Sequence, residues 1–496
     1  MKFSHLTLLV ITLLPLGINA QTPCKEVVGY YPGWQWYDRN KLVKPASIDY
    51  SKYTILQYAF MNMQTDGHLQ LTDPWADKNL LLGDINWAVA PAGYDNAYDL
   101  GNADNHIENT NLAYYAHQNN VKLLMSVGGW TLSGNFSGIA ADPTKRQTFA
   151  TECAGICELY ELDGIDIDWE YPSTLQDKTN YTILLQAIRD ALDAAEIALD
   201  RELLLTAAVS ASPTNMEYVE WDNVSEILDI INLMSYDFYG LWDPQLNHNS
   251  PLYYPGEGDP DFSCSAAVER LLTQYNVPAD KLTMGMAFYG RTQLSNAAPQ
   301  LFGTGNGIAD NTHFGIDEGT PLYYNVLLQS ENFDFYWDDN AKVPYAISAD
   351  NNSFLSYDDE MSIGYKSQYI VDNNLRGAII WEITGDYIET SPGSGVIAGT
   401  PLADKVNDVF CSVVDNVTEA SIAGYEVYPN PSSDIVFLRS NRTFSTSVFF
   451  ITNAHGQIVE CKMANKGNSI ILDIRDLARG IYFVHLEDSQ IKFIKE

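Results

Sequence analysis

The stretch DGIDIDWEYP, residues 163–172, places four acidic residues within eight positions of an otherwise apolar run. Three of the acids, Asp166, Asp168 and Glu170, alternate with apolar residues, and this period of two is typical of a β-strand. Their carboxyl groups then share one face of the strand, with successive groups roughly 6.6 Å apart. Carboxyl groups this close cannot all ionise independently, so at least one pKa should rise. This coupling predicts a site for acid–base chemistry rather than a solvated strand face.

Short apolar or β-branched runs recur up to residue 386, and amphipathic stretches such as YTILLQAIRDALDAAEIAL separate them. The alternation predicts a parallel sheet with helical crossovers. Eight such runs in a chain of this length predict an α/β fold, a (β/α)8 TIM barrel. The predicted strands are residues 26–33, 53–62, 121–130, 162–172, 202–212, 227–237, 281–291 and 375–386.

In such a barrel, catalytic residues lie at the C-terminal ends of the strands. The unusual side chains of this sequence gather there, because SVGGW ends the third predicted strand and MSYD ends the sixth. We therefore expect residues from distant parts of the chain to meet at one mouth of the barrel. Besides the acids, the candidate site residues are Tyr30, Trp34, Phe60, Ser126, Gly128, Gly129, Trp130, Tyr171, Met234, Tyr236, Asp237, Tyr289, Arg291 and Trp381.

An insertion separates the seventh and eighth predicted strands, at about residues 292–370, and contains FYWDDNAKVPYAISADNNSFLSYDDE. It is rich in short strand-like pieces and in aromatic residues. A long surface loop would be less aromatic. We therefore expect a small α+β lobe that walls one side of the mouth.

The ends and the charge of the chain bear on its location and partners. The apolar run LTLLVITLLPLGI between Lys2 and Ala20 predicts a signal peptide, residues 1–20, cleaved before Gln21. No other segment approaches the ~20 apolar residues of a membrane helix, so no membrane span is expected in the mature form. The sequence has 28 Lys plus Arg against 64 Asp plus Glu, a net charge of −36, which makes nucleic acid an unexpected partner.

The six cysteines fit no zinc-binding spacing, so no metal site is assigned and no cofactor is expected. Cys153 and Cys157 lie four apart in a helical-looking segment, where buried free thiols are expected. An exported protein can pair its cysteines, and the sequence leaves that pairing open.

The character of the chain changes after Cys411. The segment 412–424, SVVDNVTEASIAG, is a candidate linker. Residues 425–496 contain eight basic and eight acidic residues, so the large negative charge belongs to the region before them. Short strand-like runs separated by the turns YPNPSSD, NAHGQ and LARG predict a small C-terminal β-sandwich.

The acidic stretch resembles the DxxDxDxE signature of glycoside hydrolase family 18, the chitinases. Its four positions are filled by Asp163, Asp166, Asp168 and Glu170. The resemblance implies hydrolysis of β-1,4 bonds between N-acetylglucosamine units, with chitin or chitooligosaccharides as the substrate.

Three further motifs carry the same resemblance. SVGG (126–129) is similar to the family's SxGG strand, MSYD (234–237) to its MxYD strand, and Trp381 to the tryptophan of its sugar-binding floor. The resemblance covers about residues 24–411, a catalytic region expected to span 21–411. The inserted lobe resembles that of the deep-grooved, bacterial-type branch.

The family resemblance also implies roles for the acids. Glu170 would protonate the leaving oxygen, while Asp168 would hold the substrate's acetamido N–H. Asp166 would share a proton with Asp168, and Tyr236 would donate a hydrogen bond to the acetamido carbonyl. Asp163 has the opposite parity on the strand and is expected to be structural, fixing the strand's entry.

The remaining implied roles concern support and sugar binding. Tyr30 and Ser126 would support Asp166, Asp237 and Arg291 would line the neighbouring subsite, and Trp381 would stack under the distorted sugar.

The placement of the acids constrains the mechanism. Most glycoside hydrolases hold two carboxyl groups roughly 5–10 Å apart across the scissile bond. Asp168 and Glu170 instead project from one strand toward the same side, so Asp168 is badly placed to attack the opposite face of the sugar. We therefore expect substrate-assisted, retaining catalysis, in which the 2-acetamido oxygen attacks the anomeric carbon and forms an oxazolinium ion.

Two alternatives stay open. An endo-β-N-acetylglucosaminidase would cut the core of N-glycans by the same mechanism, although the inserted lobe and the aromatic floor favour chitin. A non-catalytic chitin-binding lectin of this family typically lacks the acid, whereas Glu170 is present here. The choice between endo and exo action, and processivity, are also open.

The C-terminal region resembles a second family, the sorting domain read by type IX secretion systems. The resemblance rests on YPNPSSD (428–434), HGQIV (455–459) and LARGIYFVHL (477–486). It implies an address, recognised by the secretion machinery, for a protein that is secreted or held at the cell surface after export through the periplasm. A carbohydrate-binding module is the alternative, but this region has no Trp for a sugar platform. The protein is expected to be a monomer.

Overall fold

The computed structural model describes residues 25–89, 98, 100, 101 and 103–411, and, within 425–495, eight strands with a few residues beside them. The predicted signal peptide and the predicted linker lie outside the described residues, as does most of the YPNPSSD segment. The chain divides into two compact units, Met1–Cys411 and Ser412–Glu496.

The first unit contains a closed barrel of parallel strands. Neighbours pair in the order β1-β2-β4-β5-β6-β7-β8-β13, and β13 pairs with β1 to close the ring. Each strand overlaps one of the eight predicted runs, so the predicted (β/α)8 barrel is confirmed. The strands are β1 (Glu26–Pro32), β2 (Ile55–Met63), β4 (Lys122–Gly128), β5 (Gly164–Asp168), β6 (Leu204–Ser210), β7 (Ile230–Met234), β8 (Leu282–Ala287) and β13 (Gly377–Trp381).

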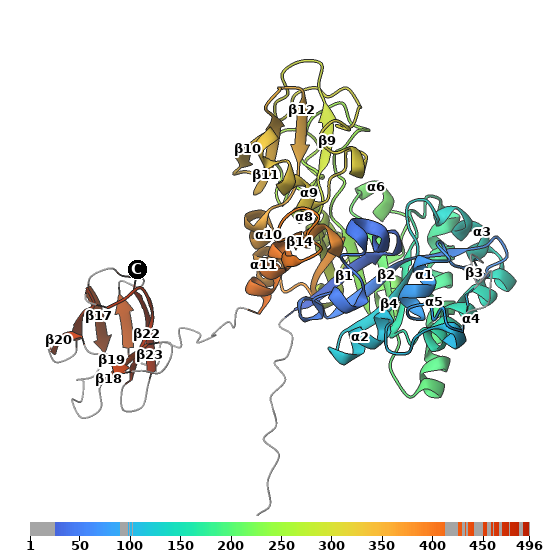
Figure 1. Ribbon diagram of the computed structural model, residues 1–496, viewed down its shortest axis with the longest axis horizontal. Helices are drawn as coiled ribbons and strands as arrows, with labels where there is room; N and C mark the ends of the chain where they lie inside the picture. The colour runs from blue at the N-terminus through green and yellow to red at the C-terminus, as the bar shows by residue number, and fades with distance from the viewer. Residues whose placement is uncertain are drawn as a thin grey trace, which may run out of the picture. The chain divides into compact units, whose positions relative to one another are not determined.

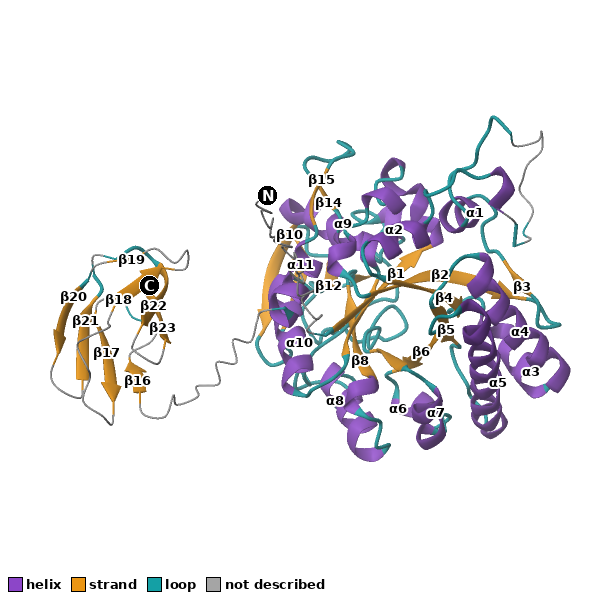
Figure 2. Cartoon of the chain, turned by 90° about the horizontal axis from the view of Figure 1, so that it is seen from below, coloured by secondary structure: helices purple, strands orange, loops and turns teal. Residues whose placement is uncertain are grey.

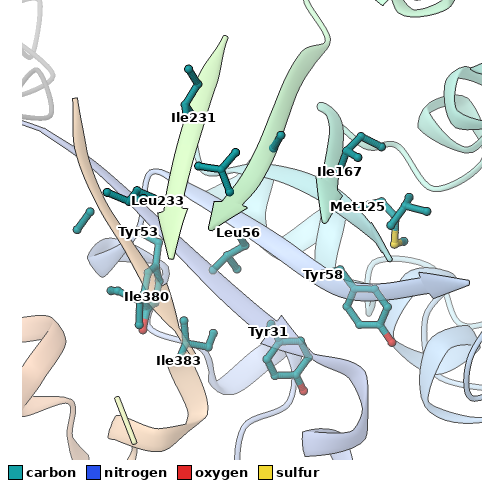
Figure 3. Close-up of a cluster of buried hydrophobic side chains, with 14 of the residues drawn as sticks. Tyr31, Tyr53, Leu56, Tyr58, Met125, Ile167, Ile231, Leu233, Ile380 and Ile383 are labelled. Atoms are coloured by element: carbon teal, nitrogen blue, oxygen red, sulfur yellow. The ribbon is translucent and has the colours of Figure 1, made fainter. Parts of the chain in front are cut away.

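The barrel strands are buried on both faces, which is why their sequences are almost continuously apolar. One face packs against the surrounding helices, and Figure 3 shows Tyr31, Leu56 and Ile231 in this core. The other face fills the barrel interior, where Val28 and Leu124 belong to a separate apolar cluster. Buried polar side chains from several strands also lie in the interior and bond to one another.

Helices surround the barrel, and Figure 2 shows α4, α5, α7, α8 and α10 outside the strands. Asp142 is the N-cap of the long helix α4, and its carboxylate accepts hydrogen bonds from the N–H groups of Thr144 and Lys145. The helices are α1 (Ala76–Leu81), α2 (Leu112–Gln118), α3 (Phe136–Ala141), α4 (Pro143–Leu159), α5 (Leu175–Leu199), α6 (Pro213–Met216), α7 (Trp221–Ile227), α8 (Cys264–Glu269), α9 (Tyr323–Leu328), α10 (Glu360–Asp372) and α11 (Pro401–Phe410). None of these described helices is both long enough and apolar enough to cross a membrane.

The insertion between β8 and β13 forms an α+β lobe, seen at the top of Figure 1. Its antiparallel sheet has the order β10-β11-β12-β9, and α9 lies between the first and second of its strands in the chain. The strands are β9 (Arg291–Leu294), β10 (Phe333–Asp338), β11 (Val343–Ser348) and β12 (Ser353–Ser356). The lobe ends earlier than the predicted 292–370, because α10 packs against β8 and β13 and is a helix of the barrel.

Three short strands complete the first unit. β3 (Leu69–Gln70) pairs antiparallel with the end of β2, and β14 (Ile388–Glu389) pairs with β15 (Ile397–Gly399).

The second unit consists of two four-stranded antiparallel sheets. Their orders are β16-β17-β21-β20 and β19-β18-β22-β23. Val436 and Leu472 of one sheet share a buried cluster with Val484 and Phe493 of the other, as in a sandwich. The strands are β16 (Tyr425–Tyr428), β17 (Ile435–Ser440), β18 (Phe450–Asn453), β19 (Ile458–Val459), β20 (Lys462–Asn465), β21 (Ser469–Asp473), β22 (Gly480–His485) and β23 (Gln490–Lys495).

Candidate active site

The candidate acids lie at the C-terminal end of β5. Asp166 is fully buried and Asp168 is 3% exposed, while Glu170 follows two residues beyond and is partly buried. The pKa values of all three carboxyl groups are raised, and burial is the largest cause for each. The expectation that at least one pKa rises on this strand is therefore met.

Asp166 lies in the barrel interior and accepts hydrogen bonds from four strands. Its Oδ2 accepts from the hydroxyl groups of Tyr30, at 2.9 Å, and Ser126, at 2.7 Å. Its Oδ1 accepts from the Thr206 hydroxyl at 2.5 Å and from the Asn232 amide at 3.3 Å. These bonds favour the ionised carboxylate and oppose the effect of burial on its pKa.

The sequence analysis missed Thr206 and Asn232, which lie in the middle of two barrel strands. Their own partners extend the polar layer, since the Gln57 amide donates to the Thr206 hydroxyl at 2.9 Å. The Thr283 hydroxyl donates to the Asn232 amide oxygen at 2.8 Å. A buried threonine or asparagine within an apolar strand was the only available signal, because such a residue needs a polar partner.

Asp168 has a different environment. Its Oδ1 is buried and has no hydrogen-bond partner among the described residues. Burial raises its pKa well above the ordinary value, and the nearby charges of Glu170 and Asp166 raise it further. None of the four hydrogen bonds of Asp166 goes to Asp168. This arrangement leaves a buried carboxyl group whose raised pKa favours the protonated form and whose Oδ1 accepts no hydrogen bond from the described residues.

Glu170 has the pKa of a residue that can donate a proton near neutral pH. Its pKa is raised to about 7: burial is the largest cause, a hydrogen bond from Tyr171 opposes it, and the negative charge of Asp237 adds to the rise. Its backbone N–H donates to the Ser133 hydroxyl at 2.8 Å, and that hydroxyl donates in turn to the Asp168 carbonyl at 3.1 Å. Ser133, which the sequence analysis did not single out, thus ties the backbone of both acids to the segment after β4.

The glycines at the end of β4 allow this close approach. Gly128 and Gly129 have φ values of +111° and +92°. The Gly129 N–H donates to the Asp168 carbonyl at 2.8 Å. A Cβ atom on Gly128 would lie 2.2 Å from that carbonyl oxygen, and one on Gly129 would lie 2.7 Å from the Phe60 ring. Any larger residue would therefore displace β5 or the aromatic side chains of the mouth.

A second polar cluster forms at the ends of β7 and β8. Asp237 Oδ1 accepts from the Tyr289 hydroxyl and from Arg291 Nε, both at 2.5 Å. The Tyr236 ring packs edge-on against Tyr289, with centroids 6.0 Å apart. Burial raises the pKa of the Tyr236 hydroxyl, with Asp168 among the charges that add to the rise, so this hydroxyl keeps its proton. Arg291 also lies over Trp242, with its guanidinium 4.7 Å from the ring centroid.

Aromatic side chains from three strand ends form a floor beside the acids. Trp381 stacks on Phe60, with centroids 5.6 Å apart and an interplanar angle of 19°. Tyr30 lies 5.6 Å and Trp34 lies 6.3 Å from Trp381, both tilted. Trp34 is 50% exposed, so this floor presents ring surface to solvent.

The other candidates differ in their burial. Tyr171 follows Glu170, and burial raises its hydroxyl pKa. Met234 is partly buried against the barrel's inner cluster. Trp130 is 74% exposed and has no aromatic partner among the described ring pairs.

Asp163 lies away from this group, at the opposite end of β5. Its Oδ2 accepts from His117 Nε2 and from the Leu123 N–H, both at 2.8 Å, and Arg201 lies 3.4 Å from its Oδ1. These contacts join β5 to α2, β4 and the segment before β6.

No group of three or more His, Cys, Asp or Glu side chains in the described part of the chain is arranged to hold a metal ion. Cys153, Cys157 and Cys264 are buried free thiols, and Cys411 and Cys461 are also free. The predicted thiol state of Cys153 and Cys157 is thus confirmed, while Cys24 lies outside the described residues.

Comparison with known proteins identifies relatives of both units. The chain is 35% identical over 416 residues to chitinase A1 from Niallia circulans, covering 74% of this chain and 57% of that protein. It is 31% identical over 491 residues to chitinase ChiA from Flavobacterium johnsoniae, covering 84% of this chain and 30% of that protein. The chain thus spans about half and about a third of the lengths of these two relatives.

The fold has a solved counterpart in the Group IV chitinase from Ostrinia furnacalis in complex with allosamidin. The TM-score is 0.63 at 27% identity, over 78% of this chain and 98% of that one.

Family models match both units. Residues 426–496 match the secretion system C-terminal sorting domain, as the sequence analysis expected. Residues 26–386, which include the barrel, its acids and the inserted lobe, match the glycosyl hydrolases of family 18. The chain therefore belongs to the glycosyl hydrolases of family 18.

Proposed function

We propose that the protein is an exported chitinase that hydrolyses β-1,4 bonds between N-acetylglucosamine units with the help of the substrate's acetamido group. The observation that supports this proposal best is the contrast between neighbouring acids on one strand face. Asp168 holds a buried oxygen without a partner among the described residues, and Glu170 has a pKa of about 7. The buried oxygen of Asp168 suits an acetamido N–H as its donor, and the raised pKa of Glu170 suits a proton donor.

The first step needs one acid. Glu170, protonated, would give its proton to the glycosidic oxygen as the bond from that oxygen to the anomeric carbon breaks. The acetamido oxygen would form a new bond to the anomeric carbon, and the resulting oxazolinium ion carries the positive charge. No second carboxylate is required on the opposite face of the sugar.

Asp168 and Tyr236 would act on the acetamido group. Asp168 would pass its proton to Asp166 as positive charge develops, and the resulting carboxylate would accept the acetamido N–H and stabilise the oxazolinium ion. The hydroxyl of Tyr236, which keeps its proton because its pKa is raised, would donate to the acetamido oxygen and orient it. Asp166 would return the proton to Asp168 when the oxazoline ring opens, and its negative charge contributes to the raised pKa of Asp168.

The second step returns the enzyme to its starting state. Glu170, now ionised, would take a proton from a water molecule that attacks the anomeric carbon. The oxazoline ring opens, the acetamido group is restored, and Glu170 is protonated again. The product retains its anomeric configuration because the carbon is attacked twice.

A product assay tests this proposal. Wild-type enzyme and its Glu170→Gln variant are incubated with colloidal chitin, chitosan oligomers and a high-mannose glycopeptide. We expect N-acetylated oligosaccharides from chitin, no cleavage after a glucosamine unit, and no products from the variant. Release of glycan from the glycopeptide alone would establish an endo-β-N-acetylglucosaminidase instead. A covalent glycosyl ester on an aspartate would contradict the substrate-assisted mechanism.

The inserted lobe is proposed to hold long substrate chains. Its first strand begins with Arg291, which pairs with Asp237 at the mouth of the barrel. Replacing residues 295–352 with a short linker should reduce hydrolysis of the polymer more than cleavage of a short chromogenic substrate. Equal losses on both substrates would mean that the lobe only stabilises the barrel.

The C-terminal unit is proposed to direct export of a monomeric enzyme and to take no part in hydrolysis. It has its own buried core, and the balanced charge of residues 425–496 contrasts with the acidic region before them. Purified residues 21–412 should therefore keep full activity on soluble oligosaccharides and elute as a monomer. A folded truncation without activity would show that this unit contributes to hydrolysis.

A further inference from the structure

A left-handed turn ends η1 (Gly33–Asn40), the short helix that carries Trp34. Three consecutive residues, Arg39, Asn40 and Lys41, have φ values of +44°, +54° and +63°. Residues other than glycine adopt this conformation at a cost of roughly 1–2 kcal/mol each, and rarely in a row. Since none of the three is glycine, the surrounding contacts must stabilise the turn.

The turn directs the Arg39 side chain into the protein, where it is 12% exposed. Its Nη1 donates to the Tyr387 carbonyl at 2.6 Å, and its Nη2 donates to the Thr384 carbonyl at 3.0 Å. Its Nε donates to the Asp38 carboxylate at 2.7 Å. The guanidinium also lies over the Tyr324 ring, with its central carbon 3.6 Å from the ring centroid. Every nitrogen of the guanidinium therefore donates a hydrogen bond, and one of its faces contacts an aromatic ring.

These contacts join three segments that are distant in the sequence. Thr384 belongs to η10 (Ile383–Asp386), which begins two residues after Trp381, and Tyr387 follows it directly. Tyr324 belongs to α9 of the lobe. Arg39 therefore links the helix of Trp34, the segment after Trp381 and the lobe.

The start of η10, the short helix after β13, is also held in place. Glu382 is buried beside Trp381, and its carboxylate accepts from the Thr384 N–H at 2.7 Å and from the Thr384 hydroxyl at 2.6 Å. Glu382 thus caps the start of η10, while Arg39 binds carbonyl groups in and after it. Without the arginine, nothing in this set of contacts would tie η10 to the helix of Trp34.

We propose that Arg39 is a positioning residue for sugar binding, which holds the rings of Trp34 and Trp381 in register with one another. The role rests on the proposed function of these rings as a sugar-binding floor. Trp34 is half exposed and meets two rings of the floor, Phe60 and Trp381, at tilted angles, so its position depends in large part on its backbone. Lysine cannot replace the arginine fully, because a single ammonium group does not reach two carbonyl groups and stack on a ring at once.

Three variants separate the side chain from the turn. Arg39→Ala removes the guanidinium, and Arg39→Lys keeps the charge without the planar fork. Asn40→Gly is the matched control, because it eases the left-handed turn at the next residue and leaves Arg39 intact. Each is made in the wild type for kinetics and in Glu170→Gln for binding of N-acetylchitohexaose by calorimetry.

We expect Arg39→Ala to weaken hexasaccharide binding about tenfold, while kcat on a short chromogenic substrate stays within about twofold. Arg39→Lys should lie between Arg39→Ala and the wild type, and Asn40→Gly should bind like the wild type. Added guanidinium ion, at concentrations far below those that unfold the protein, should restore part of the binding of Arg39→Ala. Unchanged binding by a folded Arg39→Ala, or equal losses in binding and in kcat on the short substrate, would overturn the proposal.

A sugar-free readout distinguishes this proposal from the proposed function. The near-ultraviolet circular dichroism of the wild type should contain a contribution from the Trp34 and Trp381 pair, which the spectrum of Trp34→Phe would identify by its loss. Arg39→Ala should lose the same contribution even if the wild type neither binds nor cuts chitooligosaccharides. Retention of that signal in Arg39→Ala would refute the positioning role, whatever the substrate is.

Discussion

An aspartate lies at each end of β5, and the two carboxyl groups differ in the hydrogen bonds that they accept. At the N-terminal end, Asp163 is 15% exposed along its side chain and is satisfied by donors from His117, Leu123 and Arg201. At the C-terminal end, Asp168 is buried, lies near two other acids and has an oxygen without a partner among the described residues. Only four residues, 164–167, thus separate a carboxylate that fixes structure from a carboxyl group with an unpaired oxygen among the described residues.

The comparison shows that the supply of donors, and not the residue type, decides what an aspartate does. A carboxylate with several donors is stabilised as an anion and holds its neighbours together. A carboxyl group that is buried without donors retains its proton and costs stability when it ionises. Such a cost is typical of functional sites, which supports the proposal that the C-terminal end of β5 carries the chemistry.

Glu170→Gln should produce the largest change. The amide cannot donate an acidic proton, so kcat should fall by about 10²–10⁴-fold. Binding of N-acetylchitohexaose should survive, because the amide has nearly the same shape. Steady-state kinetics and calorimetry on one protein sample measure both quantities. Residual activity within tenfold of the wild type would assign the proton donor elsewhere.

Asp168→Asn should reduce kcat by about 10²–10³-fold, because the acetamido group loses its partner and the oxazolinium ion loses its counter-charge. The same substitution should increase the stability of the protein, although it lowers kcat. The raised pKa means that wild-type stability falls as the pH rises above about 4 toward the folded-state pKa of Asp168. The variant should therefore gain stability relative to the wild type across that window, as thermal unfolding from pH 4 to pH 8 would measure. A constant difference in Tm across the window would contradict this account.

The pH dependence of the reaction should report on Glu170. Because its pKa is raised to about 7 and its protonated form is the donor, kcat/KM should decline as the pH rises through about 7. Above that point the decline should approach tenfold per pH unit. A decline that begins near pH 4.5 would show that burial does not shift this carboxyl group during turnover.

Asp163→Ala should leave kcat and its pH profile unchanged, which is the smallest expected effect on activity. The substitution leaves the Leu123 N–H without its acceptor, at a cost of about 1–3 kcal/mol in the free energy of unfolding. Chemical denaturation measures the loss, and Asn119→Ala, on the exposed end of α2, serves as the surface control. A shifted pH profile would mean that the two ends of β5 are coupled.

The barrel could be predicted from the sequence because local patterns are sufficient for it. Continuous apolar runs, each followed by an amphipathic stretch, identify strands that are buried on both faces. The period of two in DGIDIDWEYP also fixes which acids share a face, since side-chain direction alternates along any strand. The end of the lobe could not be predicted in this way, because α10 begins only three residues after β12 and no change in composition marks the boundary.

The family resemblance named Tyr30 and Ser126 as supports of Asp166, and the structure shows both hydrogen bonds. Only the tertiary structure showed the other residues that support the acids. Thr206 and Asn232 reach Asp166 from two other strands, and Ser133 reaches Glu170 from the loop after β4. Arg39 lies more than 340 residues from the carbonyl groups that it binds. Sequence patterns report the direction of a side chain relative to its own backbone, whereas these contacts depend on how the ring closes and on which loops meet above it. The sequence therefore showed the acids and their order, but it did not show the hydrogen-bond donors Thr206, Asn232 and Ser133.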